Sequence, residues 1–413
     1  VGTRNSGIDG LVVVIEQLAG VPIPASAAES LVLPQRVSDY QPAMLDELLA
    51  SGEVMWSGAG QIGGGDGWVV FHLADTAPLT LAEPADIEFT DAHRAIMDTL
   101  GGGGAYFFRQ LADNPGETLK EALWELIWSG WVTGDTFAPV RAVLSGGRRT
   151  GRGSTPAHRQ RRRPPRLSRY SLAHAQTTRA TDPTVAGRWS AVPRPEPEST
   201  VRAHFAAELL LNRHGVLTKG AAAAEQVPGG FATLYKVLTA FEDAGRCQRG
   251  YFIESLGGAQ FAVASTVDRL RSFADEVDPD RRDYHAVVLA AADPANPYGA
   301  ALPWPTRRVH DDVAHRPGRK AGALVALVDG ELAWYLERGG RTLLTFLDDP
   351  AAHNAAAAAV AELVTDGRIQ GLLIEKVDGV PVLEPGVDTT RAAVHDALVG
   401  AGFARTPRGL RLR

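Results

Sequence analysis

The sequence predicts a mixed α+β protein in which one helix-then-strand unit is repeated. Three segments share one sequence pattern, in which an amphipathic helix ends at a glycine and an apolar strand follows. Their apolar residues fall at i, i+3 and i+4 up to the glycine, which can take the left-handed conformation that ends a helix. In the third copy, two helices and a turn precede the repeated helix, and a hairpin follows it. This order predicts three tandem winged-helix domains, with the repeated segments at 45–54, 123–132 and 238–247.

The predicted boundaries follow the repeat. Residues 1–84 form the first winged helix, with its wing tip in the glycine-rich run at 63–67. Residues 85–145 form the second, which opens at Thr90, a residue whose side chain can cap the following helix. The third winged helix covers residues 196–275.

A basic linker separates the second and third units. Residues 146–195 contain twelve arginines against Asp182 alone, a net charge of +11 in a chain whose total is −6. Such a block cannot bury enough apolar surface to fold, so we expect it to be disordered. It can neutralise phosphates without sequence preference, and its aromatic residues can stack on bases, whereas the alternative is a solvated tether. The predicted nucleic-acid-binding residues are Arg159, Arg161, Arg162, Arg163, Arg166, Arg169 and Trp189.

The repeated helices themselves are acidic. Asp46, Glu125 and Glu242 each lie on one of the three. Because a carboxylate that faces a phosphate is repelled, we expect these helices to pack against neighbouring modules or subunits rather than to enter a DNA groove. Trp124, Trp128 and Trp131 of the second unit form an apolar cluster that could be an oligomer contact.

Residues 276–413 differ from the preceding units in their pattern of predicted secondary structure. Short alternating strands with Asp-Gly and Gly-Gly turns predict hairpins, and two helical segments accompany them. We predict a small β-barrel-like domain with helices. The fold class is therefore α+β, with three tandem winged-helix domains followed by this domain.

Three motifs resemble a known family. Residues 293–305 read Asp-Pro-Ala-Asn-Pro-Tyr-Gly-Ala-Ala-Leu-Pro-Trp-Pro, residues 187–190 read Gly-Arg-Trp-Ser, and residues 319–322 read Arg-Lys-Ala-Gly. These motifs resemble the C-terminal region of the large helicase-related (Lhr) ATP-dependent helicases, especially actinobacterial ones. The resemblance implies a motor elsewhere in the full-length family, a 3'-to-5' translocase on single-stranded DNA that unwinds RNA:DNA hybrids.

No G-x-x-x-x-G-K-[ST] motif occurs in this chain, so we expect no cofactor here, with ATP and Mg²⁺ bound only by the helicase core that the resemblance implies. The spacing of His310, Asp311, Asp312 and His315 matches no standard zinc pattern, and we assign no metal. No apolar run reaches the roughly 18 residues of a membrane helix. A single cysteine, Cys247, fits a reducing compartment, so we expect a cytoplasmic, nucleoid-associated protein.

The region is also similar to AlkZ-like DNA glycosylases, which stack three winged helices on a barrel, and uracil-DNA glycosylase activity is associated with some Lhr members. Their Gln-x-Gln or Gln-x-Asp motif is not found here. A glycosylase needs a pocket for a flipped base and usually a carboxylate that orients water. The candidate catalytic residues are Asp378, Asp329 and Glu375, and the candidate base-pocket residues are Asn296, Tyr298 and Trp304, although each also suits a turn or a surface strand.

Two functions remain open at this stage. The first is a nucleic-acid-binding and oligomerisation module of a DNA-repair helicase, with single-stranded DNA or an RNA:DNA hybrid as partner and a homo-oligomer as the assembly. The second is a DNA glycosylase that acts on uracil or alkylated bases through the C-terminal domain. The acidic repeated helices and the separate basic linker favour the first.

Overall fold

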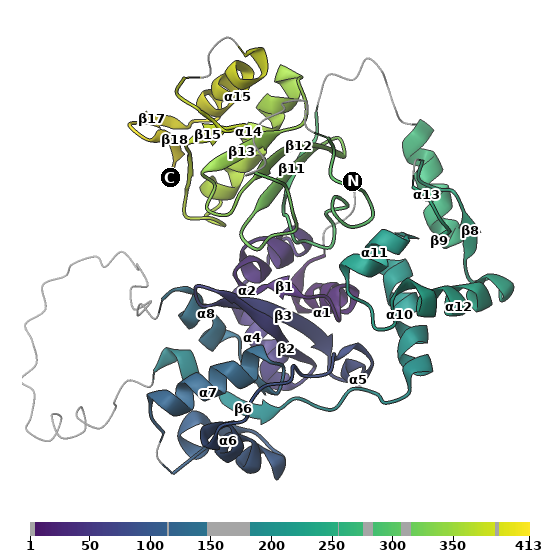
Figure 1. The fold of residues 1–413 in the computed structure, drawn as a ribbon, viewed down its shortest axis with the longest axis vertical. Coiled ribbons are helices and arrows are strands. Elements are labelled where there is room, and N and C mark those ends of the chain that lie inside the picture. Colours follow the sequence, from purple (N-terminus) through teal and green to yellow (C-terminus); the bar gives the residue numbers. More distant parts are fainter. Residues whose placement is uncertain are drawn as a thin grey trace, which may run out of the picture.

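The computed structural model describes residues 5–113, 115–146, 182–254, 256–275, 284–306, 315–384 and 388–413. The first two units lie at the centre and bottom of Figure 1, the third winged helix lies on the right, and the C-terminal domain lies on top. No helix among these residues is both long and apolar enough to cross a membrane.

The first unit is a winged helix whose wing is a long hairpin. Its sheet has the order β1-β3-β2, and β2 pairs antiparallel with β3. The repeated helix, α4, ends at Gly52, whose φ of 80° is the left-handed conformation expected from the sequence. The elements are α1 (Gly7–Leu18), β1 (Ile23–Pro24), α2 (Ala25–Ala27), η1 (Ala28–Val32), α3 (Leu33–Arg36), α4 (Pro42–Ser51), β2 (Val54–Gly63), β3 (Asp66–Leu73) and α5 (Ala77–Thr80).

The second unit completes its sheet with a strand from beyond the basic linker. Strand β6 lies between β4 and β5 and pairs antiparallel with both. Thr90 caps α6 as predicted, since its side chain accepts a hydrogen bond from the N–H of His93. The elements are α6 (Asp91–Gly101), β4 (Tyr106–Phe107), η2 (Phe108–Gln110), α7 (Glu117–Trp128), β5 (Val132–Gly134), α8 (Ala138–Leu144), η3 (Pro183–Val185) and β6 (Arg188–Ala191).

This strand corrects the predicted boundaries. Residues 188–191 were expected to end the linker, whereas they form the central strand of the second sheet. The 85–145 unit is therefore incomplete without them. The alternating pattern of four residues was too short to be recognised as a strand next to the arginine block.

The first and second units share one hydrophobic core. A Cβ atom added to Gly58 of β2 would lie 2.0 Å from the carbonyl oxygen of Ile127, and one on Gly67 would lie 2.4 Å from the ring of Trp128. Only glycine allows helix α7 to approach the wing this closely. Across the same contact, the indole N–H of Trp56 donates to the carbonyl of Gly134 at 3.1 Å. The wing of the first unit is thus buried against the second.

The third unit has a separate core and the complete winged-helix order. Its sheet is β7-β9-β8, and Leu234, Leu238 and Phe241 of the repeated helix α12 pack into the core. The elements are α10 (Ser199–His214), β7 (Val216–Leu217), α11 (Lys219–Ala224), α12 (Gly230–Asp243), β8 (Gln248–Gly250), β9 (Gln260–Ala262) and α13 (Ala264–Asp275).

The C-terminal domain contains two sheets and two helices. The larger sheet has the order β10-β11-β12-β13-β15-β16, and the smaller has the order β14-β18-β17. Within the described residues, β10 and β16 do not pair with each other, so the larger sheet is open and the predicted barrel is not confirmed. The elements are β10 (Ala286–Ala290), β11 (Leu324–Val328), β12 (Glu331–Leu336), β13 (Thr342–Thr345), α14 (Pro350–Thr365), β14 (Leu372–Ile374), β15 (Lys376–Val377), β16 (Val380–Pro381), α15 (Thr389–Gly400), β17 (Ala404–Thr406) and β18 (Gly409–Leu412).

The close approach at Gly58 generates a prediction. Gly58→Ala should lower the free energy of unfolding by about 3 kcal/mol, because the new methyl group overlaps backbone atoms that cannot rotate away. Gly101→Ala is the matched control: Gly101 is helical and has no atom within 4 Å of an added Cβ, so we expect no loss. Urea denaturation followed by tryptophan fluorescence measures both, and equal midpoints would contradict the shared core.

Candidate nucleic-acid interface

Two of the three repeated helices pack against neighbouring modules, as predicted. The carboxylate of Asp46 on α4 accepts hydrogen bonds from the hydroxyl of Thr136 (2.7 Å), the N–H of Phe137 (2.8 Å) and the guanidinium of Arg141 (2.6 Å). Burial alone would raise the pKa of Asp46, but these donors outweigh it and hold the pKa below its usual value. Helix α7 lies against β2 and β3. Each helix therefore has one face packed on a neighbouring unit, while the carboxylate of Glu125 on α7 is 57% exposed.

The third repeated helix differs, because α12 packs mainly against α10 and α11 of its own unit. Ala232, Lys236, Ala240 and Asp243 on its outer face are exposed. Figure 1 shows α12 and the wing strands β8 and β9 at the right-hand margin of the molecule. The expectation that this helix is covered by a neighbour is not met within the described part of this chain.

The predicted nucleic-acid-binding residues divide into two groups. Arg159, Arg161, Arg162, Arg163, Arg166 and Arg169 lie outside the described residues. Trp189 is described and is fully buried: it packs edge-on against Trp124, and its indole N–H donates to the carbonyl of Val185 at 3.4 Å. A ring enclosed in this way cannot stack on a base, so this assignment of Trp189 is wrong. The sequence could not distinguish an aromatic residue in a linker from one on a core strand.

The structure does bring the predicted base-pocket residues together, but they make hydrogen bonds and ring contacts within the protein. The Asn296 amide donates to the carbonyls of Ala291 (2.8 Å) and Tyr298 (3.3 Å), and its oxygen accepts from the N–H of Tyr298. The Tyr298 hydroxyl lies between the carbonyl of Gly330 and the N–H of Leu332, both at 3.2 Å. Trp304 stacks on Tyr298 with ring centroids 6.3 Å apart. The amide of Asn296 is used within the loop and the hydroxyl of Tyr298 is used on the neighbouring hairpin, so the structure gives these two residues a structural role.

The three predicted acids lie at opposite edges of the larger sheet. Strands β11, β13 and β15 run in the same direction, since β12 is antiparallel to both β11 and β13, and β13 is parallel to β15. Asp329 follows the end of β11 and Asp378 follows the end of β15, so both reach one edge. Glu375 precedes β15 and lies at the other. The three therefore do not form one catalytic group.

Asp378 and Asp329 also differ in access to solvent. Asp378 is 2% exposed, and its carboxylate accepts from the N–H (3.1 Å) and the hydroxyl (2.6 Å) of Thr345. Asp329 is exposed and accepts from the N–H of His285. It borders a hollow of about 370 Å³ at the acidic edge, whose other carboxylates are Glu331, Asp348 and Asp349. Four carboxylates repel phosphate, which disfavours DNA binding at this edge.

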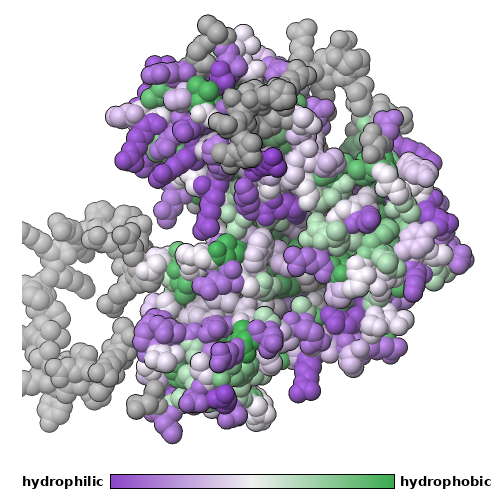
Figure 2. All heavy atoms as spheres, viewed as in Figure 1, coloured by the Kyte–Doolittle hydropathy of each residue, from purple (hydrophilic) through white to green (hydrophobic). Residues whose placement is uncertain are grey.

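The opposite edge carries unpaired cations. We call six exposed residues the cationic strip, and none of them makes an ion pair within the described part of the chain. The carbonyl of Arg341 accepts from the N–H groups of Glu375 (2.8 Å) and Lys376 (3.0 Å), which brings two hairpins together. Gly409 abuts the carbonyl of Ile374, so β18 continues the strip. Figure 2 shows hydrophilic side chains gathered over β17 and β18. The strip consists of Arg338, Arg341, Lys376, Arg408, Arg411 and Arg413.

The strip could be found only in part from the sequence. Arg408, Arg411 and Arg413 lie within six residues of one another, so the sequence shows them as one basic group. Arg338, Arg341 and Lys376 are separated from them by 32 or more residues and gave no signal. They join the strip because β13 and β15 are paired in parallel, a long-range contact that local spacing does not encode.

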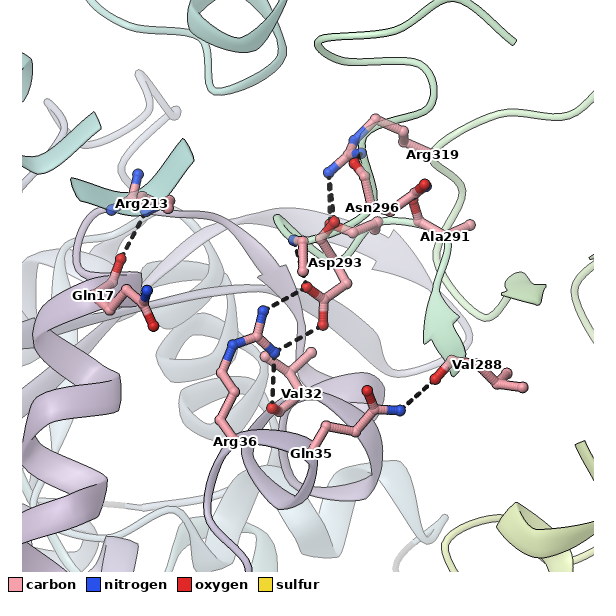
Figure 3. Close-up of polar contacts among 12 residues, drawn as sticks. Gln17, Val32, Gln35, Arg36, Arg213, Val288, Ala291, Asp293, Asn296 and Arg319 are labelled. Atoms are coloured by element: carbon pink, nitrogen blue, oxygen red, sulfur yellow. Dashed lines mark hydrogen bonds and ion pairs between the residues drawn. The ribbon is translucent and has the colours of Figure 1, made fainter. Parts of the chain in front are cut away.

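A polar junction holds three domains together (Figure 3). Arg36 on α3 makes a bidentate ion pair with Asp293 of the C-terminal domain, at 3.0 and 2.7 Å, and Asp293 is 1% exposed. Beside it, the Gln35 amide donates to the carbonyl of Val288. Arg319 donates to the carbonyls of Asn296 (2.7 Å) and Asp293 (2.9 Å), which fixes the loop that carries the carboxylate. Burial lowers the pKa of Arg319.

The third winged helix is attached at the same place. Arg213 on α10 donates to the carbonyls of Gln17 (2.7 Å) and Ala19 (2.6 Å), at the end of α1, and pairs with Glu225. Burial lowers the pKa of Arg213. Burial would raise the pKa of Glu225, but the hydrogen bond from His214 and the charge of Arg213 lower it. The junction thus orients α12 and the cationic strip relative to the same central unit. No group of three or more potential metal ligands occurs among the described residues.

Comparison with known proteins agrees with this domain order. Two models of the winged-helix domain of the large helicase-related protein match residues 1–74 and 196–282. A Mycolicibacterium smegmatis protein described as "Lhr helicase/ probable uracil glycosylase" is 76% identical over 416 residues, which cover all of this chain and 27% of that protein. An Escherichia coli "Lhr helicase/uracil glycosylase" is 39% identical over 98% of this chain and 26% of its own length.

Residues 1–74 and 196–282 thus belong to winged-helix families of the Lhr protein, and the whole chain is similar to part of the Lhr relatives. This confirms the resemblance inferred from the sequence motifs. The chain spans about a quarter of the length of these Lhr relatives. Among solved structures, the DNA glycosylase AlkZ of Streptomyces sahachiroi aligns with 88% of the chain and 98% of its own, at 11% identity and a TM-score of 0.40.

The junction of this chain generates a prediction. Arg36→Ala should lower the free energy of unfolding by about 3 kcal/mol, because it leaves the buried Asp293 carboxylate without its partner. The control is Arg94→Ala, which removes the pair with Asp91, whose side chains are 60% and 103% exposed, and should cost less than about 1 kcal/mol. Thermal or urea unfolding measures the midpoint of each variant. If Arg36→Ala shifts the midpoint no more than Arg94→Ala does, the junction has no structural role.

Proposed function

We propose that this chain is a nucleic-acid-binding part of a DNA-repair helicase and that the cationic strip binds the phosphates. The observation that carries the proposal is the run of six exposed cations without carboxylate partners. Cations that are already paired with acids contribute little to phosphate binding, whereas unpaired ones release counterions from the nucleic acid. The relatives are described as helicases, and the ATPase motor would lie in the part of such a protein that this chain does not span.

The distribution of charge supports the position of this site. Asp46 of the repeated helix α4 faces inward, and the hollow beside Asp329 is acidic. The strip begins at the opposite edge of the same sheet, where its six cations outnumber the carboxylate of Glu375. We propose single-stranded DNA or an RNA:DNA hybrid as the ligand, since the strip offers phosphate contacts rather than a recognition helix.

The strip is tested by its effect on salt dependence. Replacing Arg338, Arg341, Lys376 and Arg408 with alanine removes four charges. If each contacts one phosphate, the slope of log K against log salt concentration for single-stranded DNA should become shallower by about 3, and affinity at low salt should fall at least tenfold. Fluorescence anisotropy with a labelled oligonucleotide across a salt series measures both.

The control removes four exposed arginines elsewhere, Arg94, Arg109, Arg194 and Arg271. Its net charge equals that of the strip variant, so non-specific field effects are matched. A strip variant whose slope equals that of the control would refute the proposal.

A second function, cleavage of the glycosidic bond of uracil, is favoured by one observation: both relatives carry uracil glycosylase in their description. In such a reaction water adds to the sugar carbon, and the base leaves with a proton. Of the three candidate acids, Asp329 is the accessible one next to a hollow, while Asp378 is enclosed. We place this function second because the hollow is lined by four carboxylates.

The test uses uracil-containing single-stranded DNA followed by hot alkali, which breaks the strand at an abasic site. If the chain is a glycosylase that uses Asp329, Asp329→Asn should reduce breakage at least 100-fold. Asp366→Asn, an exposed acid on another surface, should leave it unchanged. Equal breakage in wild type and Asp329→Asn would exclude Asp329, and no breakage by wild type would exclude the activity.

Self-association remains a prediction, but the tryptophans that suggested it are engaged within the chain. Trp128 is 5% exposed, Trp124 donates to the carbonyl of Thr184 at 3.1 Å, and Trp131 donates to that of Ala85 at 3.0 Å. The proposed cytoplasmic, nucleoid-associated location follows from DNA as the partner.

A further inference from the structure

We infer that a hollow between the first and third winged helices binds one unpaired nucleotide base. The hollow has a volume of about 710 Å³ and lies where the end of α1 meets α10, α12 and α13. This volume falls within the usual range for small-ligand sites, which often form between domains. The inference rests on the proposed binding of nucleic acid and adds the position of a base.

The walls of the hollow are apolar and aromatic. Leu211 of α10 and Phe241 of α12 line its inner side, and Leu270 and Phe273 of α13 line its outer side. Phe273 is 50% exposed, so its ring is accessible from solvent at the hollow. An aromatic ring at the open side of a hollow can stack on any base.

Two side-chain amides supply polar recognition. Gln17 at the end of α1 and Asn212 on α10 both line the hollow, and neither amide makes a hydrogen bond within the described residues. Gln17 is held in place through its backbone carbonyl, which accepts from Arg213 at 2.7 Å. An amide donates through nitrogen and accepts through oxygen, so two amides can pair with the donors and acceptors along the edge of a base. In contrast, the amide of Asn296 in the C-terminal domain is already bonded to backbone.

The charges around the hollow match a ligand with a single phosphate. Arg246 stacks on Phe241 at 4.1 Å and pairs with Glu208, and Arg213 pairs with Glu225. Arg269, which lies 5.6 Å from the ring of Phe273, has no carboxylate partner among the described residues. One unpaired guanidinium beside aromatic walls and free amides fits a nucleotide better than an apolar peptide, which would leave the amides unsatisfied.

The probe is deoxyuridine monophosphate, titrated into the full chain and followed by calorimetry or ligand-detected NMR. We expect saturable binding that deoxyribose 5-phosphate does not reproduce. The double variant Gln17→Leu/Asn212→Leu should weaken it at least tenfold, because it removes both amides. Gln61→Leu/Gln370→Leu, two exposed amides on other surfaces, is the matched control and should bind as wild type does.

A conservative variant guards against misfolding. Asn212→Asp keeps the size of an exposed side chain and removes its N–H donors, so it should also weaken binding with the fold intact. Phe273→Ala should weaken binding about fivefold or more by removing a stacking surface. No saturable binding by wild type, or equal binding by Asn212→Asp and wild type, would overturn the inference.

The variant of the cationic strip separates this inference from the proposed function. If that variant loses affinity for single-stranded DNA and still binds deoxyuridine monophosphate, both proposals hold. If it binds DNA normally while the amide variants lose the nucleotide, the strip proposal fails and the hollow stands. If it loses DNA and wild type binds no nucleotide, the strip stands and the hollow is refuted.

Discussion

The buried ion pair between Arg36 and Asp293 is the interaction on which the arrangement of domains depends. Asp293 is almost completely enclosed, so its charge is tolerated only because a bidentate guanidinium neutralises it. Arg319 holds the loop of Asp293 from behind, and Arg213 ties the third winged helix to the end of α1 a short distance away. Ion pairs and backbone hydrogen bonds are directional. They therefore specify one orientation where apolar packing alone would allow several.

This fixed orientation determines where the charged residues lie on the molecule. Strand direction in the C-terminal sheet puts Asp329 and Asp378 at one edge and Lys376 at the other, so a single sheet has an acidic edge and a cationic edge. The junction attaches the cationic edge to the side of the central winged helix. The same junction closes one side of the hollow that Gln17 and Asn212 line. Phosphate binding and base binding would therefore occur on surfaces held by one rigid connection.

The fold was predictable wherever the information is local. The glycine that ends α4, the cap at Thr90 and the complete order of the third winged helix follow from residues close together in the sequence. The inward packing of α4 agrees with the prediction made from Asp46, whereas α7 packs through its apolar face and its Glu125 is exposed. Predictions failed where the outcome depends on contacts with other parts of the fold. Strand β6 completes a sheet that begins before the linker, and Trp189 of this strand lies in a core. The amide of Asn296 is hydrogen-bonded within its own loop. No local pattern distinguishes these from a linker tryptophan or a free amide.

The sequence by itself determined the winged-helix repeat, the resemblance to the Lhr family and the segregation of positive charge, because periodicity, motifs and composition are properties of the chain. Only the tertiary structure decided which cations share an edge, which acids are enclosed and which amides remain open to a ligand. The physical reason is that strand pairing and domain docking bring together residues far apart in the sequence. A polar group that this buries must hydrogen-bond within the protein, whereas one that stays exposed can bind a ligand.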